Sequence, residues 1–490
     1  MNAMAPAAAT DERLTVFRVE HTEGKAITYD LAVLCKKLGV DDPGRLVVET
    51  QGHHGLVMVY PRNPLAEVRA VTREDLVMDR HGRFTTGLYH NGQPVRKRLY
   101  DPSTGSAQRF ALFGTTGAGK SRALQLQLIA EKVNRICTWL ADLKEGQSVP
   151  EAAGNVDWRA TSQEAAILML MAAVKVAEAR MRRYSAMGRN SFVLGTDPLL
   201  HVWIDEANRL LERGAPYRNL GTHLIKELGR TGRSVGVGIG LAAQASHLEE
   251  LGGSDTLRAM IKEGEVVLLR WSASMMRQLV SDGILPGGTQ LVPIPKTMVP
   301  TALRSPFDVG QDDGDVPGTQ GMAYYLSGQR PTAIMRHLRL GSIAPLEGLD
   351  PEILDLYGPE EPHRLEEISH EAAGAAFSLR DDPAAFEALC DEFRETYEQK
   401  QKTSGGQSAA PAKTGEDSPK QGGKVGIAGR ILAALAAADA PMTADEVLEV
   451  VNTDGGRTVK LSSLQNTLGV LVNRGDIDRT GRGLYTLADS

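Results

Sequence analysis

The sequence predicts an α/β chain with a mostly parallel central sheet, a small α+β region before it and a small helical domain after it. Two observations predict the sheet. Between residue 109 and about residue 340, strand-length apolar runs such as LLHVWI and EVVLLRW alternate with helical stretches, and such runs are typical of strands that helices cover on both faces. A glycine-rich turn also joins the first of these strands to a helix-forming run.

The composition is that of a folded chain without a membrane segment. The hydrophobic fraction of 42% lies near the globular average, and the net charge of −6 gives no chain-wide basic surface for nucleic acid or anionic membrane. Cys35, Cys137 and Cys390 lie far apart, which indicates a reducing compartment. The longest apolar run, residues 165–174, is shorter than the roughly 20 residues of a spanning helix. We therefore expect a cytoplasmic protein with no intrinsic membrane segment.

The domain boundaries follow from shifts in composition, since 490 residues allow about three domains at roughly 150 residues each. Short β-rich runs open the chain, an acidic helical stretch follows the central domain, and a segment rich in Gly, Ser, Pro and Ala predicts a flexible linker. The predicted parts are an α+β region (1–80), the central α/β domain (81–345), the acidic helical segment (346–400), the linker (401–424) and a compact C-terminal domain (425–490).

A β-hairpin is predicted at the start of the central domain. Its strands, residues 84–89 and 93–99, flank the pair Asn91-Gly92, and Asn-Gly supplies the positive φ angles that a tight hairpin turn demands.

The strongest motif is the glycine-rich turn itself, which matches G-x-x-x-x-G-K-S and lies between a strand and a helix. Its backbone N–H groups would cradle a β-phosphate, Lys120 would reach the β- and γ-phosphates, and Ser121 would ligate Mg²⁺. The alternative is a purely structural glycine-rich turn that binds no ligand. The predicted ATP-binding residues are Gly114, Thr115, Thr116, Gly117, Ala118, Gly119, Lys120 and Ser121.

A second motif supplies carboxylates at the end of another buried strand. In LLHVWIDE, Asp205 would hold Mg²⁺ together with Ser121, and Glu206 would polarise the attacking water as a general base. The alternative is an Asp-Glu pair that caps the following helix through its dipole.

Further polar residues near the motifs are weaker candidates. Gln244 ends the strand VGVGIGLAA and could contact a γ-phosphate or the water, although a lone Gln after a strand is equally a structural residue. Arg230 and Arg233 precede that strand, and Arg277 follows a later one. Arginine neutralises charge on a transferred phosphoryl group, in cis or across a subunit boundary. All three could instead be solvated or face DNA.

Together these segments resemble the FtsK/SpoIIIE motor family, and within it the TraB-like plasmid-transfer branch. The resemblance covers residues 84–340 and depends on FALFGTTGAGKS, VWIDEANRLL and ELGRTGRSVGVGIGLAAQ. It implies a RecA-like P-loop NTPase that uses ATP and Mg²⁺, assembles as a homo-oligomer, commonly a hexameric ring, and moves double-stranded DNA. Lys120, Ser121, Asp205, Glu206 and Gln244 occupy matching positions, and Arg233 matches less securely.

The chain departs from this family in two places. The N-terminal membrane region that is usual in the family is not found in the sequence, and the strand before Gln244 ends in AAQ where the family usually has ATQ. The first departure argues against a membrane pore formed by this chain. It is compatible with a peripheral complex that contains a membrane-protein partner.

The C-terminal domain looks like a winged helix-turn-helix, because three predicted helices are followed by a short hairpin around residues 481–483. Thr443 and Glu446 have the spacing of a capping box for the second helix. Polar residues of the third helix and arginines of the wing would contact base edges and phosphates; a winged helix used for protein contact is the alternative. The predicted DNA-contact residues are Lys460, Ser462, Ser463, Gln465, Asn466, Arg479 and Arg482.

The sequence thus predicts an ATP-driven translocase of double-stranded DNA with its own DNA-reading domain, serving conjugative plasmid transfer. Two alternatives stay open: a chromosome-segregating or DNA-processing translocase of FtsK or HerA type, and a DNA-binding regulator that uses ATP as an assembly switch without movement.

Overall fold

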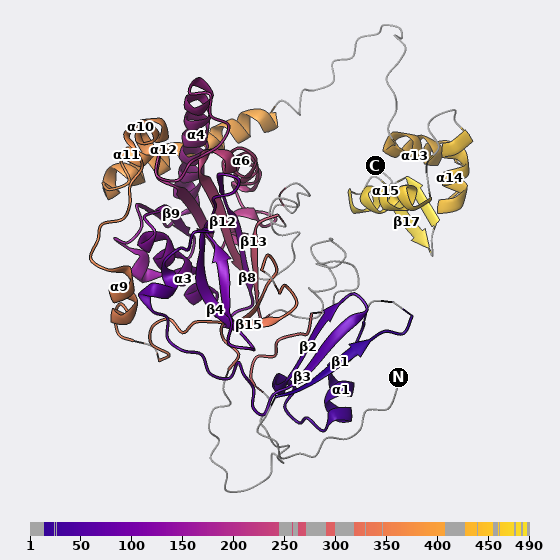
Figure 1. Ribbon diagram of the computed structural model, residues 1–490. Coiled ribbons are helices and arrows are strands. Elements are labelled where there is room, and N and C mark those ends of the chain that lie inside the picture. The colour runs from indigo at the N-terminus through magenta and orange to yellow at the C-terminus, as the bar shows by residue number, and fades with distance from the viewer. Residues whose placement is uncertain are drawn as a thin grey trace. The chain divides into compact units, whose positions relative to one another are not determined.

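The computed structural model divides the chain into two compact units, Met1–Ser404 and Gly405–Ser490 (Figure 1). The structure describes residues 14–23, 25, 27–244, 257, 263–270, 291–298, 318–328, 330–344, 346–406, 427–438, 440–453, 459, 461–474, 477–481 and 484–487. The predicted linker lies outside these residues from position 407 onward.

A ten-stranded sheet forms the centre of the first unit. The strands on one side of this sheet are parallel, as the apolar runs predict. These strands are buried along all or nearly all of their length, as is typical of parallel strands. These strands are, in spatial order, β10 (Trp158–Ala160), β9 (Cys137–Asp142), β11 (Leu200–Asp205), β12 (Val237–Gln244), β8 (Arg109–Gly114) and β13 (Glu265–Leu269).

The sheet continues beyond β13 with antiparallel strands, which the apolar pattern did not predict. The predicted hairpin forms at β4 and β5, and it joins the central sheet through pairing of β4 with β15. The antiparallel strands are β14 (Met322–Tyr325), β15 (Ile334–His337), β4 (Arg83–Tyr89) and β5 (Pro94–Arg98).

Two groups of helices cover the sheet. In the first, α3 (Lys120–Val133) packs against β8 and β9 and against α2 (Arg73–Leu76). In the second, α4 (Gln163–Ala186) packs against β9, β10 and β11 and against α6 (Arg218–Thr231). The apolar run 165–174 lies in α4, where the Ser162 side chain accepts a hydrogen bond from the Ala165 N–H and caps the helix. The short helix α5 (Asn208–Leu211) follows β11, and the short strands β6 (Tyr100–Asp101) and β7 (Ser106–Ala107) precede β8.

The α+β region at the N-terminus has a small core of its own. Strands β1 (Thr15–Glu20), β3 (His54–Val59) and β2 (Leu46–Gln51) form an antiparallel sheet in that order, and α1 (Leu31–Leu38) packs beside it around Cys35, Leu46 and Val57. An ion pair of 2.7 Å between Arg330 and Glu49 links this sheet to the region after β14.

The acidic helical segment packs onto the central domain. It comprises α9 (Pro351–Tyr357), α10 (Glu367–Ala373), α11 (Ala375–Ser378) and α12 (Pro383–Gly406), so that α12 extends past residue 401, where the linker was expected to begin. The ring of Phe377 lies 5.0 Å from that of Trp139 and 5.6 Å from that of Trp158. These aromatic contacts place the segment in the same hydrophobic core as the sheet.

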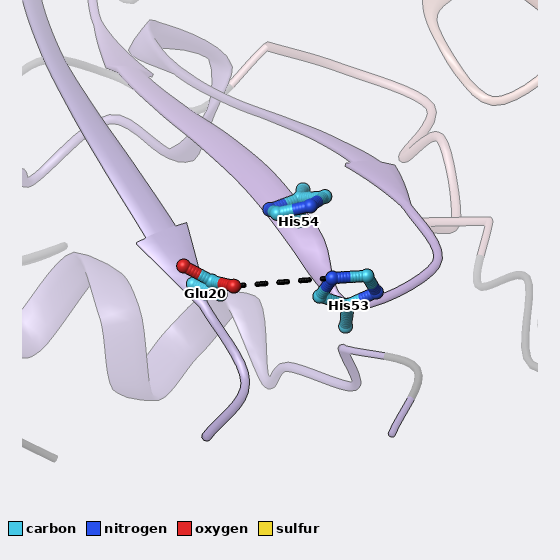
Figure 2. Close-up of side chains that lie close together, drawn as sticks. All are labelled: Glu20, His53 and His54. Carbon is cyan, nitrogen blue, oxygen red and sulfur yellow. Dashed lines mark ion pairs between the residues drawn. The ribbon is translucent and has the colours of Figure 1, made fainter. Parts of the chain in front are cut away.

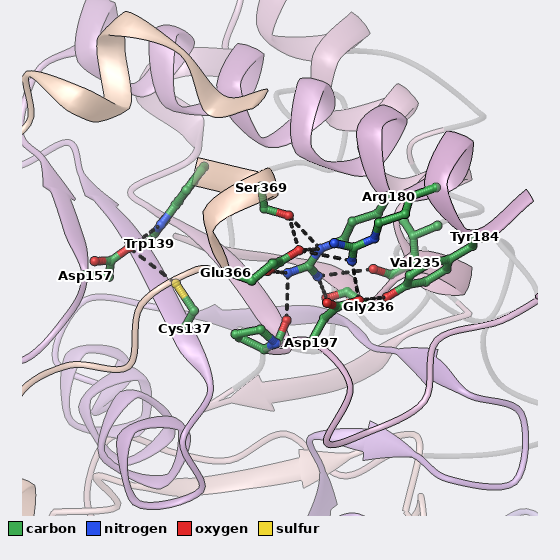
Figure 3. Close-up of polar contacts among 12 residues, drawn as sticks. Cys137, Trp139, Asp157, Arg180, Tyr184, Asp197, Val235, Gly236, Glu366 and Ser369 are labelled. Atoms are coloured by element: carbon green, nitrogen blue, oxygen red, sulfur yellow. Dashed lines mark hydrogen bonds and ion pairs between the residues drawn. The ribbon is translucent and has the colours of Figure 1, made fainter. Parts of the chain in front are cut away.

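A buried arginine fixes α10 to the sheet (Figure 3). Arg180 of α4 donates to the Glu366 carboxylate at 3.1 and 2.7 Å and to the Ser369 hydroxyl at 3.0 Å. It also donates to the carbonyls of Val235, Gly236 and Pro198. Every N–H of this guanidinium therefore has an acceptor, as a charge that is 1% exposed requires.

The second unit contains the three expected helices followed by the expected hairpin, and also a short strand, β16 (Met442–Thr443), that was not predicted from the sequence. In chain order its elements are α13 (Ile427–Ala436), β16, α14 (Ala444–Thr453), α15 (Leu461–Arg474), β17 (Ile477–Gly481) and β18 (Leu484–Leu487). Thr443 and Glu446 form the predicted reciprocal cap of α14, since the Thr443 N–H donates to the Glu446 carboxylate and the Glu446 N–H donates to the Thr443 hydroxyl. Over the described residues of both units, each helix is too short or too polar to cross a bilayer.

Candidate nucleotide-binding site

The carboxyl ends of four parallel strands meet at one edge of the sheet. Gly114 at the end of β8 lies opposite Gln244 of β12 on one side and Leu269 of β13 on the other. Asp205 ends β11, the next strand beyond β12. In open α/β sheets this edge is where ligands bind, and the structure brings both predicted motifs to it.

The glycine-rich turn has backbone angles that require glycine. Gly117 and Gly119 have φ of 72° and 98°, values that side chains rarely adopt. A Cβ on Gly119 would lie 3.0 Å from the Gly321 nitrogen, and the Gly321 N–H donates to the Ala118 carbonyl at 2.9 Å. The turn before β14 thus packs tightly against the loop, which then enters α3 at Lys120.

Lys120 contacts both carboxylates of the second motif. Its Nζ lies 2.8 Å from Oδ1 of Asp205 and 2.9 Å from Oε1 of Glu206, and all three residues are buried. Burial alone would lower the pKa of Lys120, but the two carboxylates outweigh it, so that the pKa is raised above its usual value. The ammonium is therefore fully charged at neutral pH and is held between two anions.

The carboxylate of Asp205 has one oxygen that Lys120 does not occupy. Its Oδ2 is buried and accepts no hydrogen bond from the described residues. Ser121 follows Lys120 in the first turn of α3 and supplies a second hard oxygen. Carboxylate and hydroxyl oxygens are what Mg²⁺ prefers, so that the residues present fit the predicted ion.

Glu206 has an unusual backbone conformation. Its φ of 51° places it in the left-handed region, although it is not a glycine. Hydrogen bonds on both sides hold it there, since the Ala207 N–H donates to the Ala242 carbonyl and the Arg209 N–H donates to the Glu206 carbonyl. Such conformations cost about 1–3 kcal/mol and concentrate at functional sites, where they aim a side chain.

The two arginines predicted near the site lie elsewhere. Arg233 is in a short 3₁₀ helix (Arg233–Val235) before β12, whereas Gln244 ends that strand and is exposed beside Gly114. An eight-residue strand spans about 25 Å, so Arg233 is far from the loop of its own chain. Arg230 is exposed and paired with Glu227 at 3.1 Å. Arg277 lies outside the described residues.

Arg270 is the residue that sequence reasoning missed. It follows β13 directly, one position after the register partner of Gly114, and a Cβ on Gly117 would lie 3.7 Å from its Nη1. In the run EVVLLR an arginine ends a buried strand, just as Asp205 ends the strand LLHVWID. This position was the sequence signal that could have identified Arg270 as a site residue.

The structure describes only part of the predicted DNA-contact set. Gln465 is exposed on α15, and Arg479 is exposed on β17 with its guanidinium 5.9 Å from the ring centre of Tyr485. Ser462, Ser463 and Asn466 belong to α15, while Lys460 and Arg482 lie outside the described residues.

No protein-family model matches the sequence, and no curated protein matches it. Among solved structures, the chain is similar to the pCW3 conjugation coupling protein TcpA in its monomer form with ATPγS, with a TM-score of 0.43 and 12% identity over 66% of this chain and 85% of that one. It is also similar to the cytoplasmic domain of the type VII secretion ATPase EccC from Thermomonospora curvata, with a TM-score of 0.41 and 18% identity over 63% of this chain.

A third similar structure comprises ATPases 2 and 3 of EssC from Geobacillus thermodenitrificans, with a TM-score of 0.39 and 14% identity over 68% of this chain. The chain spans 34% of the EccC chain and 52% of the EssC chain.

Proposed function

We propose that this chain is an ATP-hydrolysing motor of FtsK/SpoIIIE type that moves double-stranded DNA, with plasmid DNA in conjugative transfer as its cargo. The observation that supports the proposal most is the convergence of Lys120, Asp205 and Glu206 beside a glycine-rich loop at the carboxyl edge of a parallel sheet. The TraB-like motif pattern of the sequence favours plasmid DNA as the cargo.

The proposed chemistry uses residues that already lie in contact. The loop amides and the amino end of α3 bind the β-phosphate, and Lys120 exchanges its carboxylate contacts for phosphate oxygens. Bound Mg²⁺, held by Ser121 and Asp205, would neutralise phosphate charge. Glu206 takes a proton from water as the water oxygen bonds to the γ-phosphorus, and the bond from that phosphorus to the β–γ bridging oxygen breaks, which yields ADP and phosphate.

The position of Lys120 couples nucleotide binding to the general base. An ammonium 2.9 Å from Oε1 of Glu206 competes with water for the same oxygen. Transfer of the ammonium to a phosphate therefore leaves the Glu206 carboxylate free to accept the proton of the attacking water.

We further propose a homo-oligomer, a hexameric ring, in which Arg233 acts across the subunit boundary. The distance of Arg233 from its own loop and its partly exposed side chain support a role in trans. In this assembly the second unit reads DNA as a winged helix, with Gln465 and Arg479 on its exposed surface. A membrane-protein partner would place the complex peripherally at a membrane.

The test is ATP turnover by the full chain with no DNA, with single-stranded DNA and with long double-stranded DNA. Strong stimulation by duplex DNA is expected. Its loss in Glu206→Gln but not in Glu212→Gln, an exposed acid on the same segment, would tie turnover to the general base.

Turnover that ignores DNA would favour the ATP-switched DNA-binding regulator, and displacement of a triplex strand from long duplex DNA separates movement from binding alone. The DNA sequence that residues 425–490 prefer separates plasmid transfer from chromosome segregation.

A further inference from the structure

A buried arginine that the proposed hydrolysis does not use faces the glycine-rich loop. Arg270 is 7% exposed and has a φ of 43°, so it is held in the left-handed region without being a glycine. Its backbone N–H donates to the Met322 carbonyl at 3.1 Å, which ties it to the next strand of the sheet. A strained conformation that the surrounding structure maintains aims the side chain in one direction.

The guanidinium is braced on one side and turned to the loop on the other. Its Nε donates to the Thr319 hydroxyl at 3.1 Å, and its Nη2 donates to the Lys296 carbonyl at 3.2 Å. Its Nη1 is the atom that would lie 3.7 Å from a Cβ on Gly117. Two fixed donors leave the third nitrogen pointing at the loop that would carry the phosphates.

We propose that Arg270 binds a β- or γ-phosphate oxygen of the nucleoside triphosphate in the same chain. This inference rests on the nucleotide site of the proposed function. A planar guanidinium matches phosphate oxygens, and charge-assisted hydrogen bonds are strongest in a site from which water is largely excluded. Since Arg270 needs no neighbouring subunit, its contribution to binding is complete in a monomer, unlike that of Arg233.

Binding of fluorescent ATP, ADP and AMP analogues to the full chain tests this role. We expect Arg270→Ala to weaken ATP binding about 10- to 100-fold, the range for a lost charge-assisted hydrogen bond, and to leave AMP binding unchanged. An equal loss for ADP assigns the contact to the β-phosphate, and a loss for ATP alone assigns it to the γ-phosphate. Added guanidinium should restore part of the affinity.

Arg336→Ala is the matched control, because Arg336 braces the same turn through the carbonyls of Gln320 and Gly318. If Arg270→Ala resembles this control and guanidinium rescues neither, Arg270 only supports the turn and the inference is overturned. Wild-type affinity of Arg270→Ala overturns it as well. Loss of all nucleotide binding in Lys120→Ala tests the proposed site separately, so the two failures are distinguishable.

A second inference concerns a separate cluster in the N-terminal sheet (Figure 2). Glu20 at the end of β1 pairs in register with His54 at the start of β3, and His53 precedes it in the turn. One ligand atom of each side chain lies within 4.8 Å of the others, and Nε2 of His53 is 3.8 Å from Oε1 of Glu20. The His21 N–H donates to the His53 carbonyl at 2.8 Å and fixes the turn to β1.

The geometry points to a binding site for a divalent transition metal, with Zn²⁺ as the ion that two imidazoles and a carboxylate fit. Metal-ligand bonds of about 2.0–2.1 Å require ligand atoms roughly 3.3 Å apart. Glu20 and His54 are exposed and His53 is partly buried, and binding requires their ligand atoms to move closer than the 4.8 Å within which they lie. Three protein ligands leave a fourth position for water or for another ligand.

Calorimetric titration of the chelator-treated full chain with ZnCl₂ tests the site. We expect one ion per chain with micromolar affinity, at least tenfold weaker in His53→Ala and in His54→Ala. His81→Ala, an exposed histidine of the same unit, is the control. Equal affinity in the control and in the two cluster variants, or no binding by the wild type, would exclude the site.

Discussion

The carboxylate of Glu366 neutralises a guanidinium that lies far back in the sequence, since its Oε2 is 2.7 Å from Nη2 of Arg180. This pair joins the acidic helical segment to α4 and to the start of β12. Arg180 is almost fully buried, and among the residues that the structure describes Glu366 is the carboxylate that pairs with it.

Glu366→Ala should therefore destabilise the first unit by about 3–5 kcal/mol, the cost of leaving a buried charge unpaired. Denaturant unfolding followed by tryptophan fluorescence measures this, since Trp139, Trp158 and Trp203 are all buried in the first unit. Glu367→Ala, next to it and exposed, should change stability by less than about 0.5 kcal/mol. Equal effects of the two substitutions would show that the pair contributes nothing.

Lys120→Ala should lower ATP turnover by at least about 100-fold, because the substitution removes the cation that contacts the phosphates. It also leaves Asp205 and Glu206 without their shared counter-ion. DNA binding by the full-length variant, measured by fluorescence anisotropy, should persist, since the second unit has its own hydrophobic core. Near-wild-type turnover would contradict the nucleotide site.

Gly236→Ala should destabilise the start of β12 by about 2–5 kcal/mol. The residue has a φ of 72°, and an added Cβ would lie 2.3 Å from Cδ2 of Phe192. The left-handed backbone costs about 1–2 kcal/mol, and the steric overlap adds about 1–3 kcal/mol. Gly188→Ala separates the two, because Gly188 has a φ of 67° with nothing within 4 Å of its Cβ position. Thermal unfolding of both variants measures their loss of stability. Equal losses would show that the Phe192 ring moves aside and that the steric overlap costs nothing.

The first unit should lose stability in mild acid through His337. Burial and the nearby Lys97 lower the pKa of His337 from 6.5 to about 4, so the unfolded chain binds the proton more readily than the folded chain. The resulting stability is fully present above pH 6.5 and is lost as the pH falls to 4, by about 3 kcal/mol.

Urea unfolding between pH 4 and pH 7.5 measures this loss. His337→Asn keeps a donor for the Thr86 carbonyl but does not titrate, so its stability should depend less on pH. His81→Asn should follow the wild type, and a His337→Asn profile parallel to the wild type would exclude His337 as the cause.

The motifs were predictable because their chemistry is local in sequence. The spacing of the glycine-rich loop predicts a phosphate-binding turn, and the strand that ends in Asp-Glu predicts carboxylates at the edge of the sheet. In the structure, Lys120 of the loop contacts both of these carboxylates. Arg270 could have been found at the end of the buried run EVVLLR, but its contact with Thr319 was not predictable, since that contact joins two segments with no motif of their own. The antiparallel side of the sheet was missed for a similar reason, because β4 precedes the loop but pairs with a strand that follows it. Arg233 precedes β12, as the sequence predicts, and so lies at the end of that strand away from the loop of its own chain.

The pairing of β4 with β15 has a consequence for the synthesis of the chain. The hairpin β4–β5 leaves the ribosome early, but its partner β15 begins only at Ile334, long after Tyr89. At about 5–20 residues per second, the hairpin waits roughly 12–50 s for a neighbour. During synthesis one edge of the hairpin therefore has unpaired N–H and C=O groups, and this interval is when the nascent chain is most open to misassembly with other strands.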